Sequence, residues 1–195
     1  MTKRDMKILP RLAAATALLC GLGAAATAQT MVTGDEAKAA LFPTKGARAV
    51  VFNLPGLDDK TKAVLGEVAK DQKYFGAIAL APEKGLASAQ AAVNYHSVAA
   101  AERAAIAACQ SAAKTQCRIA AHVLPAGYAE RGLTLSVDAT QGFNDSYLPA
   151  GSPKALAISP STGQWSIAAG QGAGATATRS CNAKGAGDCQ VVVAD

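Results

Sequence analysis

Four cysteines fall into two pairs of equal spacing, and this arrangement restricts the fold more than any other feature of the chain. Seven residues separate Cys109 from Cys117, and seven separate Cys181 from Cys189. Each second cysteine is followed by a short apolar stretch that contains Ile or Val, which favours a strand. Because the spacing recurs with the same downstream pattern, it indicates an internal repeat.

A second match lies upstream of the cysteines. Residues 76–85 read GAIALAPEKG and residues 154–163 read KALAISPSTG, so an aliphatic run, a proline and a glycine recur in the same order. Residue 154 follows residue 76 by 78 positions, whereas Cys181 follows Cys109 by 72, so the second copy is six residues shorter. We therefore predict two repeat units, over residues 74–124 and 153–195.

Each unit has the pattern of a β-hairpin followed by a helix and a strand. Pro82 suits the second position of a type I turn, and Gly85 suits the left-handed position after it. Second hairpin strands are expected over residues 86–93 and 164–169. Ser97 is a good N-cap for the alanine-rich helix that reaches the first cysteine pair. The corresponding helix of the second unit contains Gly and Thr and is expected to be shorter.

The remaining segments complete an α+β fold. We expect helices near residues 35–41, 57–70 and 133–148, and a strand over residues 47–52. Since a unit of this size has little core of its own, the two units are expected to share a mostly antiparallel sheet in one compact domain over residues 29–195. The predicted organisation is a signal peptide over residues 1–28, a helix–strand–helix extension over 29–73, the first unit over 74–124, a connecting helical segment over 125–152 and the second unit over 153–195.

The N-terminus has the pattern of a secretory signal peptide. Four basic residues precede an apolar run over residues 12–25, and residues 26–28 read Ala-Thr-Ala, which predicts cleavage before Gln29. The run is shorter than a spanning helix requires. Cys20 follows two leucines rather than a small residue, so it is assigned to the removed segment and not to a lipid anchor. The expected location is therefore the periplasm or the extracellular medium, with no membrane span in the mature chain.

An exported chain can keep disulfides, and the repeat selects Cys109–Cys117 and Cys181–Cys189 from the three possible pairings. The seven-residue gap differs from the C-x-x-C spacing of zinc and redox sites, so no metal or cofactor is expected. The signal peptide holds four of the 19 basic and one of the 14 acidic residues, which leaves 15 basic and 13 acidic residues, or a net charge of +2. This small and scattered charge gives no reason to expect nucleic-acid binding.

Tyr95 and His96 are the candidate functional residues, because they stand just before the long helix of the first unit and have no counterpart in the second. His96 could act as a general base, or the segment could simply be a loop that caps the helix. Strand alternation places His122 on the face opposite Ile119 and Val123 and predicts a structural role. No residue is assigned as catalytic.

The first unit resembles a bacterial exported family known as domain of unknown function 4189. Residues 74–79 read YFGAIA where the family usually has Y-G-A-I-A, and the alanine-rich segment before Cys109 and the Cys-Arg-Ile at Cys117 match its later motifs. Phe75 is an insertion relative to this pattern. The resemblance covers residues 74–195, weakens in the second unit, implies secretion and disulfides, and carries no catalytic residues.

We therefore expect a non-catalytic binding or envelope-associated protein, and not an enzyme. Its partner would be a protein or an envelope component, and the sequence predicts no oligomeric state. One alternative is a small periplasmic hydrolase with a cleft near His96 between the two units. The other is an inhibitor or immunity-type protein.

Overall fold

The computed structural model describes residues 31–195. The predicted signal peptide, its cleavage site before Gln29 and Cys20 lie outside the described residues. Among the residues described, no helix has the length and apolar character needed to span a bilayer.

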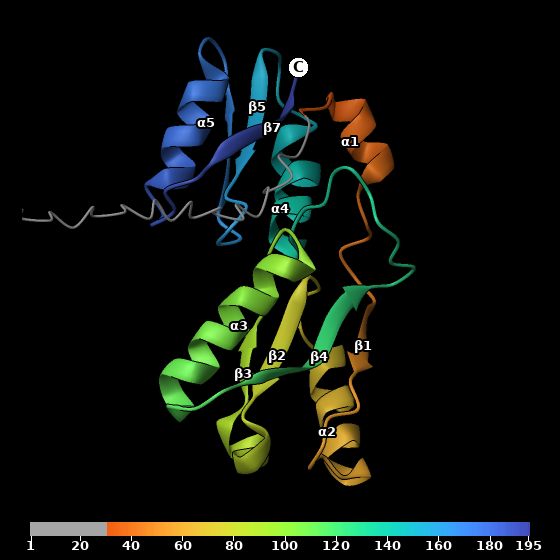
Figure 1. Cartoon of the computed structure of the whole chain (residues 1–195). Helices are drawn as coiled ribbons and strands as arrows, with labels where there is room; N and C mark the ends of the chain where they lie inside the picture. The colour runs from red at the N-terminus through yellow and green to blue at the C-terminus, as the bar shows by residue number, and fades with distance from the viewer. Residues whose placement is uncertain (1–30) are drawn as a thin grey trace, which may run out of the picture.

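The strands form two separate sheets, and all pairs within them are antiparallel (Figure 1). The first sheet has the order β1-β4-β2-β3 and the second the order β6-β5-β7. With their flanking helices they confirm the predicted α+β class. The strands are β1 (Ala47–Val51), β2 (Gly76–Leu80), β3 (Gln90–Ala92), β4 (Arg118–Pro125), β5 (Lys154–Ile158), β6 (Trp165–Ala169) and β7 (Gln190–Ala194).

The expectation that the two units share one sheet is wrong. In each unit the last strand returns to the free side of the first hairpin strand, so β4 pairs with β2 and β7 pairs with β5. Each unit thus completes a three-stranded sheet from its own strands. In the first sheet β1 also pairs with β4 over five residues. It thereby occupies the free edge of β4, which the second unit could otherwise have joined.

The molecule has two lobes, one around each sheet (Figure 1). We call residues 47–125 the first lobe, and residues 32–40 with 137–195 the second lobe. The chain passes between them twice, over residues 41–46 and 126–136. The predicted N-terminal extension is thus divided between the lobes, because its first helix lies in the second lobe and its strand and second helix lie in the first.

Each sheet lies between helices on its two faces. In the first lobe α2 (Asp59–Lys70) covers one face and α3 (Val98–Ala113) the other. In the second lobe α5 (Ala173–Asn182) covers one face. The other face packs against α1 (Gly34–Ala40), α4 (Val137–Gly142) and the π-helical turn η2 (Phe143–Tyr147). Both lobes therefore have a hairpin, a helix and a last strand in the same order, with helices on both faces of the sheet, whereas β1 has no counterpart in the second lobe.

Helix α3 follows the sequence prediction closely. The Ser97 hydroxyl accepts a hydrogen bond from Ala100 N at 3.2 Å, and Lys114 ends the helix in the left-handed conformation with φ of 57°. The helix approaches β2 closely because small buried residues meet at the contact. These residues are Ala101, Ala105, Cys109 and Ala113 on the helix and Ala77, Ala79 and Ala81 on or next to the strand. A larger side chain here would have to push the helix off the sheet.

The cysteines are bonded as the repeat predicts, Cys109 to Cys117 and Cys181 to Cys189. The Cα atoms of the two pairs are 6.1 and 6.0 Å apart. Each bond joins the last turns of a helix, α3 or α5, to the residue just before the next strand. Closing a loop of this length stabilises a fold by roughly 2–3 kcal/mol in the chain-entropy description.

The first hairpin differs from its prediction. Residues 82–88 form a 3₁₀ segment, η1 (Pro82–Ser88), and the second strand begins only at Gln90. The reason is the Ser88 hydroxyl, which accepts from Ala81 N at 3.0 Å and donates to Gly85 O at 2.8 Å. These bonds fold the segment onto itself, so no strand can begin at Leu86. The second hairpin forms as expected, with β6 over residues 165–169.

A β-bulge in β4 changes the predicted direction of one side chain. Ile78 pairs with Ala121 but the next residue, Ala79, pairs with Ile119, which leaves Ala120 as the extra residue. Beyond a bulge the alternation of faces reverses. Ile119 and His122 therefore both lie on the α3 side, and the expectation that they lie on opposite faces is wrong.

The connecting helix is shorter than the predicted residues 133–148. It begins at Val137, because the Ser136 hydroxyl accepts from Ala139 N and caps it there. Gly142 lies inside the helix against the Trp165 ring, and a Cβ at this position would stand 2.2 Å from a ring carbon. Gly142 lowers helix propensity in the sequence, but packing against Trp165 requires it. The chain then continues as η2.

Candidate functional site

The two candidate residues lie in the loop between β3 and α3, where the lobes meet. His96 is 1% exposed. Tyr95 is half-buried beside the alanine cluster of α3, and its N–H donates to Phe75 O at 3.1 Å. We call the contact region between the lobes, residues 94–97, 134–138 and 163–164, the waist.

Both ring nitrogens of His96 are used inside the protein. Ser136 N donates to Nδ1 at 3.1 Å, so Nδ1 carries no proton. Nε2 therefore carries the proton and donates to Gln164 O at 3.1 Å. The ring thus connects three parts of the chain, since its own loop belongs to the first lobe, Ser136 to the connecting segment and Gln164 to the second lobe. It presents no free nitrogen to a substrate.

Burial lowers the pKa of His96 to about 4. The main cause is the loss of solvation of the charged ring. Hydrogen bonds to Gln164 and Gly163 and the negative charge of Asp188 favour the charged form and offset this only in part. His96 is neutral at neutral pH and serves to hold the waist together.

A second group of contacts supports the same loop. Asn94 has φ of 65° and its side chain accepts from Asp138 N at 3.1 Å and donates to the Asp138 carboxylate at 3.0 Å. Lys73 donates to both oxygens of that carboxylate, at 2.6 and 2.7 Å. Thr134 donates its hydroxyl proton to His96 O at 2.5 Å. The first lobe is therefore joined to α4 of the second lobe through the Asp138 contacts, and to the crossing segment through Thr134.

The backbone packs tightly at the waist. Gly163 has φ of +74°, and a Cβ added there would stand 2.7 Å from Asn94 O and 3.2 Å from the Tyr95 Cα. Only glycine fits both the conformation and the space. The loop before α3 and the turn between β5 and β6 are thus in direct contact, and the position predicted as a possible cleft is filled.

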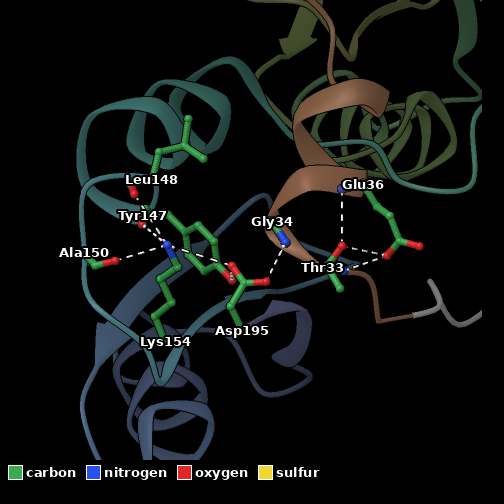
Figure 2. A network of polar contacts seen from close by, with 8 residues as sticks. All are labelled: Thr33, Gly34, Glu36, Tyr147, Leu148, Ala150, Lys154 and Asp195. Atoms are coloured by element: carbon green, nitrogen blue, oxygen red, sulfur yellow. Dashed lines mark hydrogen bonds and ion pairs between the residues drawn. The ribbon is translucent and has the colours of Figure 1, made fainter.

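A second polar centre joins the ends of the described chain (Figure 2). The Asp195 carboxylate accepts from Gly34 N at 2.9 Å and from the Tyr147 hydroxyl at 3.1 Å. It thereby binds the start of α1 next to the capping box of Thr33 and Glu36. Burial and the adjacent Asp195 carboxylate raise the pKa of Tyr147, so its hydroxyl remains a donor.

Lys154 completes this centre. Its ammonium group donates to three backbone carbonyls, those of Tyr147 at 3.1 Å, Leu148 at 3.4 Å and Ala150 at 3.1 Å (Figure 2). It lies 4.7 Å from the centre of the Tyr147 ring and 3.8 Å from an Asp195 oxygen. The π-helical turn creates this arrangement, because it directs several carbonyls toward one point. Every donor of the ammonium group has a partner, which is typical of a structural role.

A histidine–carboxylate pair lies on the α3 side of the first sheet. His122 Nε2 lies 2.6 Å from Glu102 Oε1, and the Phe52 ring stands edge-on 4.7 Å from the imidazole. The side chains are 18% and 38% exposed. A carboxylate that orients a partly exposed imidazole is an arrangement that general bases use.

Sequence reasoning missed the residues that make these centres. Asn94 carries the one available signal, since asparagine tolerates the left-handed conformation and often marks tight loops. Tyr147, Lys154 and Asp195 come from three elements and have no spacing in common. Within residues 31–195, no group of three or more His, Cys, Asp or Glu side chains is placed to hold a metal ion.

Comparisons of the chain with protein-family models, with curated proteins and with solved structures find no match.

Proposed function

We propose that the protein is an exported, non-catalytic binding protein that acts in the periplasm or outside the cell. In this proposal its mature chain is built from two copies of one disulfide-stabilised unit. The equal order of elements and the equal placement of the disulfides in the two lobes support the duplication. The two disulfides support a location where thiols are oxidised.

The observation that carries the proposal is the filled waist. An enzyme of this architecture would use a cleft between the lobes, with a titratable group open to substrate. Here His96 occupies that place at 1% exposure and uses both ring nitrogens internally. The arrangement suits a rigid scaffold that presents its outer surface to a partner.

We propose membership of the domain of unknown function 4189 family on the same basis as the resemblance. Its support is the motif around residues 74–79 and the cysteine-flanked helix and strand that follow. Membership of this family would imply secretion and disulfides, and it would assign no catalytic residues.

A partner surface is proposed on α2. Val64 and Val68 stand one helical turn apart and are 43% and 49% exposed. Among the exposed large apolar side chains of residues 31–195, these two lie next to one another on one helix, which is why the contact with a partner is proposed here. The expected partner is a protein of the envelope, and an inhibitor or immunity-type interaction is one form of this function.

Site-specific crosslinking in the native envelope tests the proposal. A photoreactive amino acid at Val64 or Val68 should give one reproducible adduct, whereas the same probe at exposed Glu130 in the β4–α4 connection should not. The captured protein, once purified, should bind the mature chain, and Val64→Lys should abolish this binding. The absence of any adduct, together with turnover of an envelope substrate by the pure protein, would defeat the proposal.

A second candidate, a small hydrolase, is favoured by the Glu102–His122 pair rather than by His96. In this alternative His122 would take a proton from water and Glu102 would orient the imidazole. His122→Gln should then abolish hydrolysis of a panel of esters and amides. His96→Gln should leave the rate of the chemical step unchanged. Activity that is absent from the natural chain, or unchanged in His122→Gln, would exclude this alternative.

A further inference from the structure

A hollow of about 360 Å³ opens at one side of the waist. Its walls are the crossing segment that enters β1, the loop between α2 and β2, and the first residue of α4. It is therefore formed where the chain passes between lobes, a position at which ligand sites are common. The residues that line it are Thr44, Lys45, Gly46, Ala47, Lys70, Asp71, Gln72, Lys73, Tyr74 and Val137.

The lining carries charged groups of both signs. It contains the three lysines Lys45, Lys70 and Lys73 and one acidic residue, Asp71, and carboxylates outside the lining pair with two of the lysines. An ammonium group without such a pair attracts an anion more strongly in a concave site than on a flat surface. The volume is within the range of sites for small organic ligands.

The three lysines differ in their partners. Lys73 donates to both oxygens of Asp138, and Lys70 contacts Glu67 at 2.6 Å. Within residues 31–195, by contrast, Lys45 has neither an ion pair nor a hydrogen bond from its ammonium group. Lys45 is thus the lysine of the hollow whose charge remains available to a ligand.

The backbone of the same segment has unused donors. Neither Lys45 N nor Gly46 N donates to another group of the described chain. Gly46 has φ of +86°, and turns with a residue in this region can direct successive N–H groups toward one anion. Residues 45 and 46, which line the hollow, therefore have an ammonium group and two amide N–H groups without a partner among residues 31–195.

We propose that this hollow binds a small anion that carries a carboxylate or phosphate group, with Lys45 as its main recognition residue. The ion pairs of Lys70 with Glu67 and of Lys73 with Asp138 hold the walls in place. The site goes beyond the proposed partner surface on α2, because it lies on another part of the molecule and takes a solute rather than a protein.

Titration of the ¹⁵N-labelled mature chain, residues 29–195, tests the site. Citrate, inorganic phosphate and, as a cationic control, choline are added separately at low ionic strength. Citrate or phosphate should shift the amide signals of residues 44–47 and 70–74 with saturation, and choline should not. The stronger of the two anions identifies whether carboxylate or phosphate is preferred.

Two variants show whether the site is specific. Lys45→Ala should weaken binding by about tenfold, the loss of one charge-assisted hydrogen bond. Lys60→Ala removes an exposed lysine of α2 outside the hollow and should change affinity less than about twofold. Equal effects of the two variants, shifts spread over all lysine-rich surfaces, or no saturation by either anion would overturn the proposal. None of these outcomes bears on the crosslinking test, so the two proposals fail separately.

Discussion

At the scale of single residues, the waist depends on His96, a buried and neutral histidine. His96 donates through Nε2 and accepts through Nδ1, so protonation would place a proton on Nδ1 opposite the Ser136 N–H and leave a charge buried. In the sequence His96 suggests catalysis, but in the fold its hydrogen bonds hold the two lobes together. Its protonation should be visible as a pH dependence of the stability of the fold.

The first prediction concerns this pH dependence. The pKa of His96 is about 4 in the folded chain and near 6.5 in the unfolded chain, so unfolding takes up a proton between these values. Stability should be fully present above pH 6.5 and decrease as pH falls, by about 1.4 kcal/mol per pH unit and roughly 3 kcal/mol in all. Urea unfolding of the natural chain and of His96→Gln at pH 7.5 and pH 5 measures the difference. An equal pH response in both chains would contradict this role.

A second prediction concerns the contact at Gly163. In Gly163→Ala the new Cβ would meet Asn94 O at 2.7 Å in a backbone conformation that alanine adopts poorly. We expect a loss of about 2–4 kcal/mol in unfolding free energy. Gly185→Ala is the matched control, since Gly185 has φ of +93° but nothing within 4 Å of an added Cβ. It should lose only about 1 kcal/mol, and equal losses would show that the contact at Gly163 contributes nothing.

At the scale of elements, helix α1 is held by the last residue of the described chain. Gly34 N at its start donates to Asp195, and the same carboxylate accepts from Tyr147. Val32, just before the helix, also bridges β7 in parallel orientation. Seven residues would form only a marginal helix alone, so these contacts fix α1 on the second lobe.

The third prediction follows from the Asp195 centre. Asp195→Ala should lower the unfolding free energy by about 2 kcal/mol, because it leaves the buried Tyr147 hydroxyl without an acceptor. Adding Tyr147→Phe to this variant should recover part of the loss, since it removes the orphaned hydroxyl. Thermal and denaturant unfolding measure both steps. A double variant that is less stable than Asp195→Ala would show that the hydroxyl has another partner.

The elements that the sequence predicts well are those with local signals. Ser97 is a helix cap that can be recognised from residue type and position, and α3 begins directly after it. In the structure Asp58 caps α2 in the same way, because its carboxylate accepts from Thr61 N at 2.7 Å. The elements that differ depend on distant contacts. The Ser88 hydroxyl shortens the first hairpin, and the bulge at Ala120 arises only from pairing with β2. Neither of these two features can be recognised in the hydrophobic pattern of the sequence.

At the scale of the whole molecule, the same limit explains the incorrect prediction of a shared sheet. The repeat indicates which elements each unit contains, but the pairing of β4 with β2 and β7 with β5 is a long-range choice. The sequence predicts only part of the site. It indicates Tyr95 and His96 as candidates near the contact of the two units. The contacts of Asn94 and Asp138 and the Asp195 centre can be recognised only from the three-dimensional arrangement.

The two lobes, with separate sheets, are joined by a waist in which polar bonds and close backbone contacts fill the space around His96. The proposed binding function requires such a rigid connection between the lobes. Independent lobes would instead move about residues 41–46 and 126–136 and could open a cleft beside His96. The two arrangements differ in how the lobes tumble in solution.

Backbone ¹⁵N relaxation of the mature chain at pH 7 measures this most directly. Amides of β2 and β4 report on the first lobe, and amides of β5 and β7 report on the second. We predict one shared rotational correlation time, as for a single body of this mass. Two distinct and shorter correlation times, one for each sheet, would contradict it.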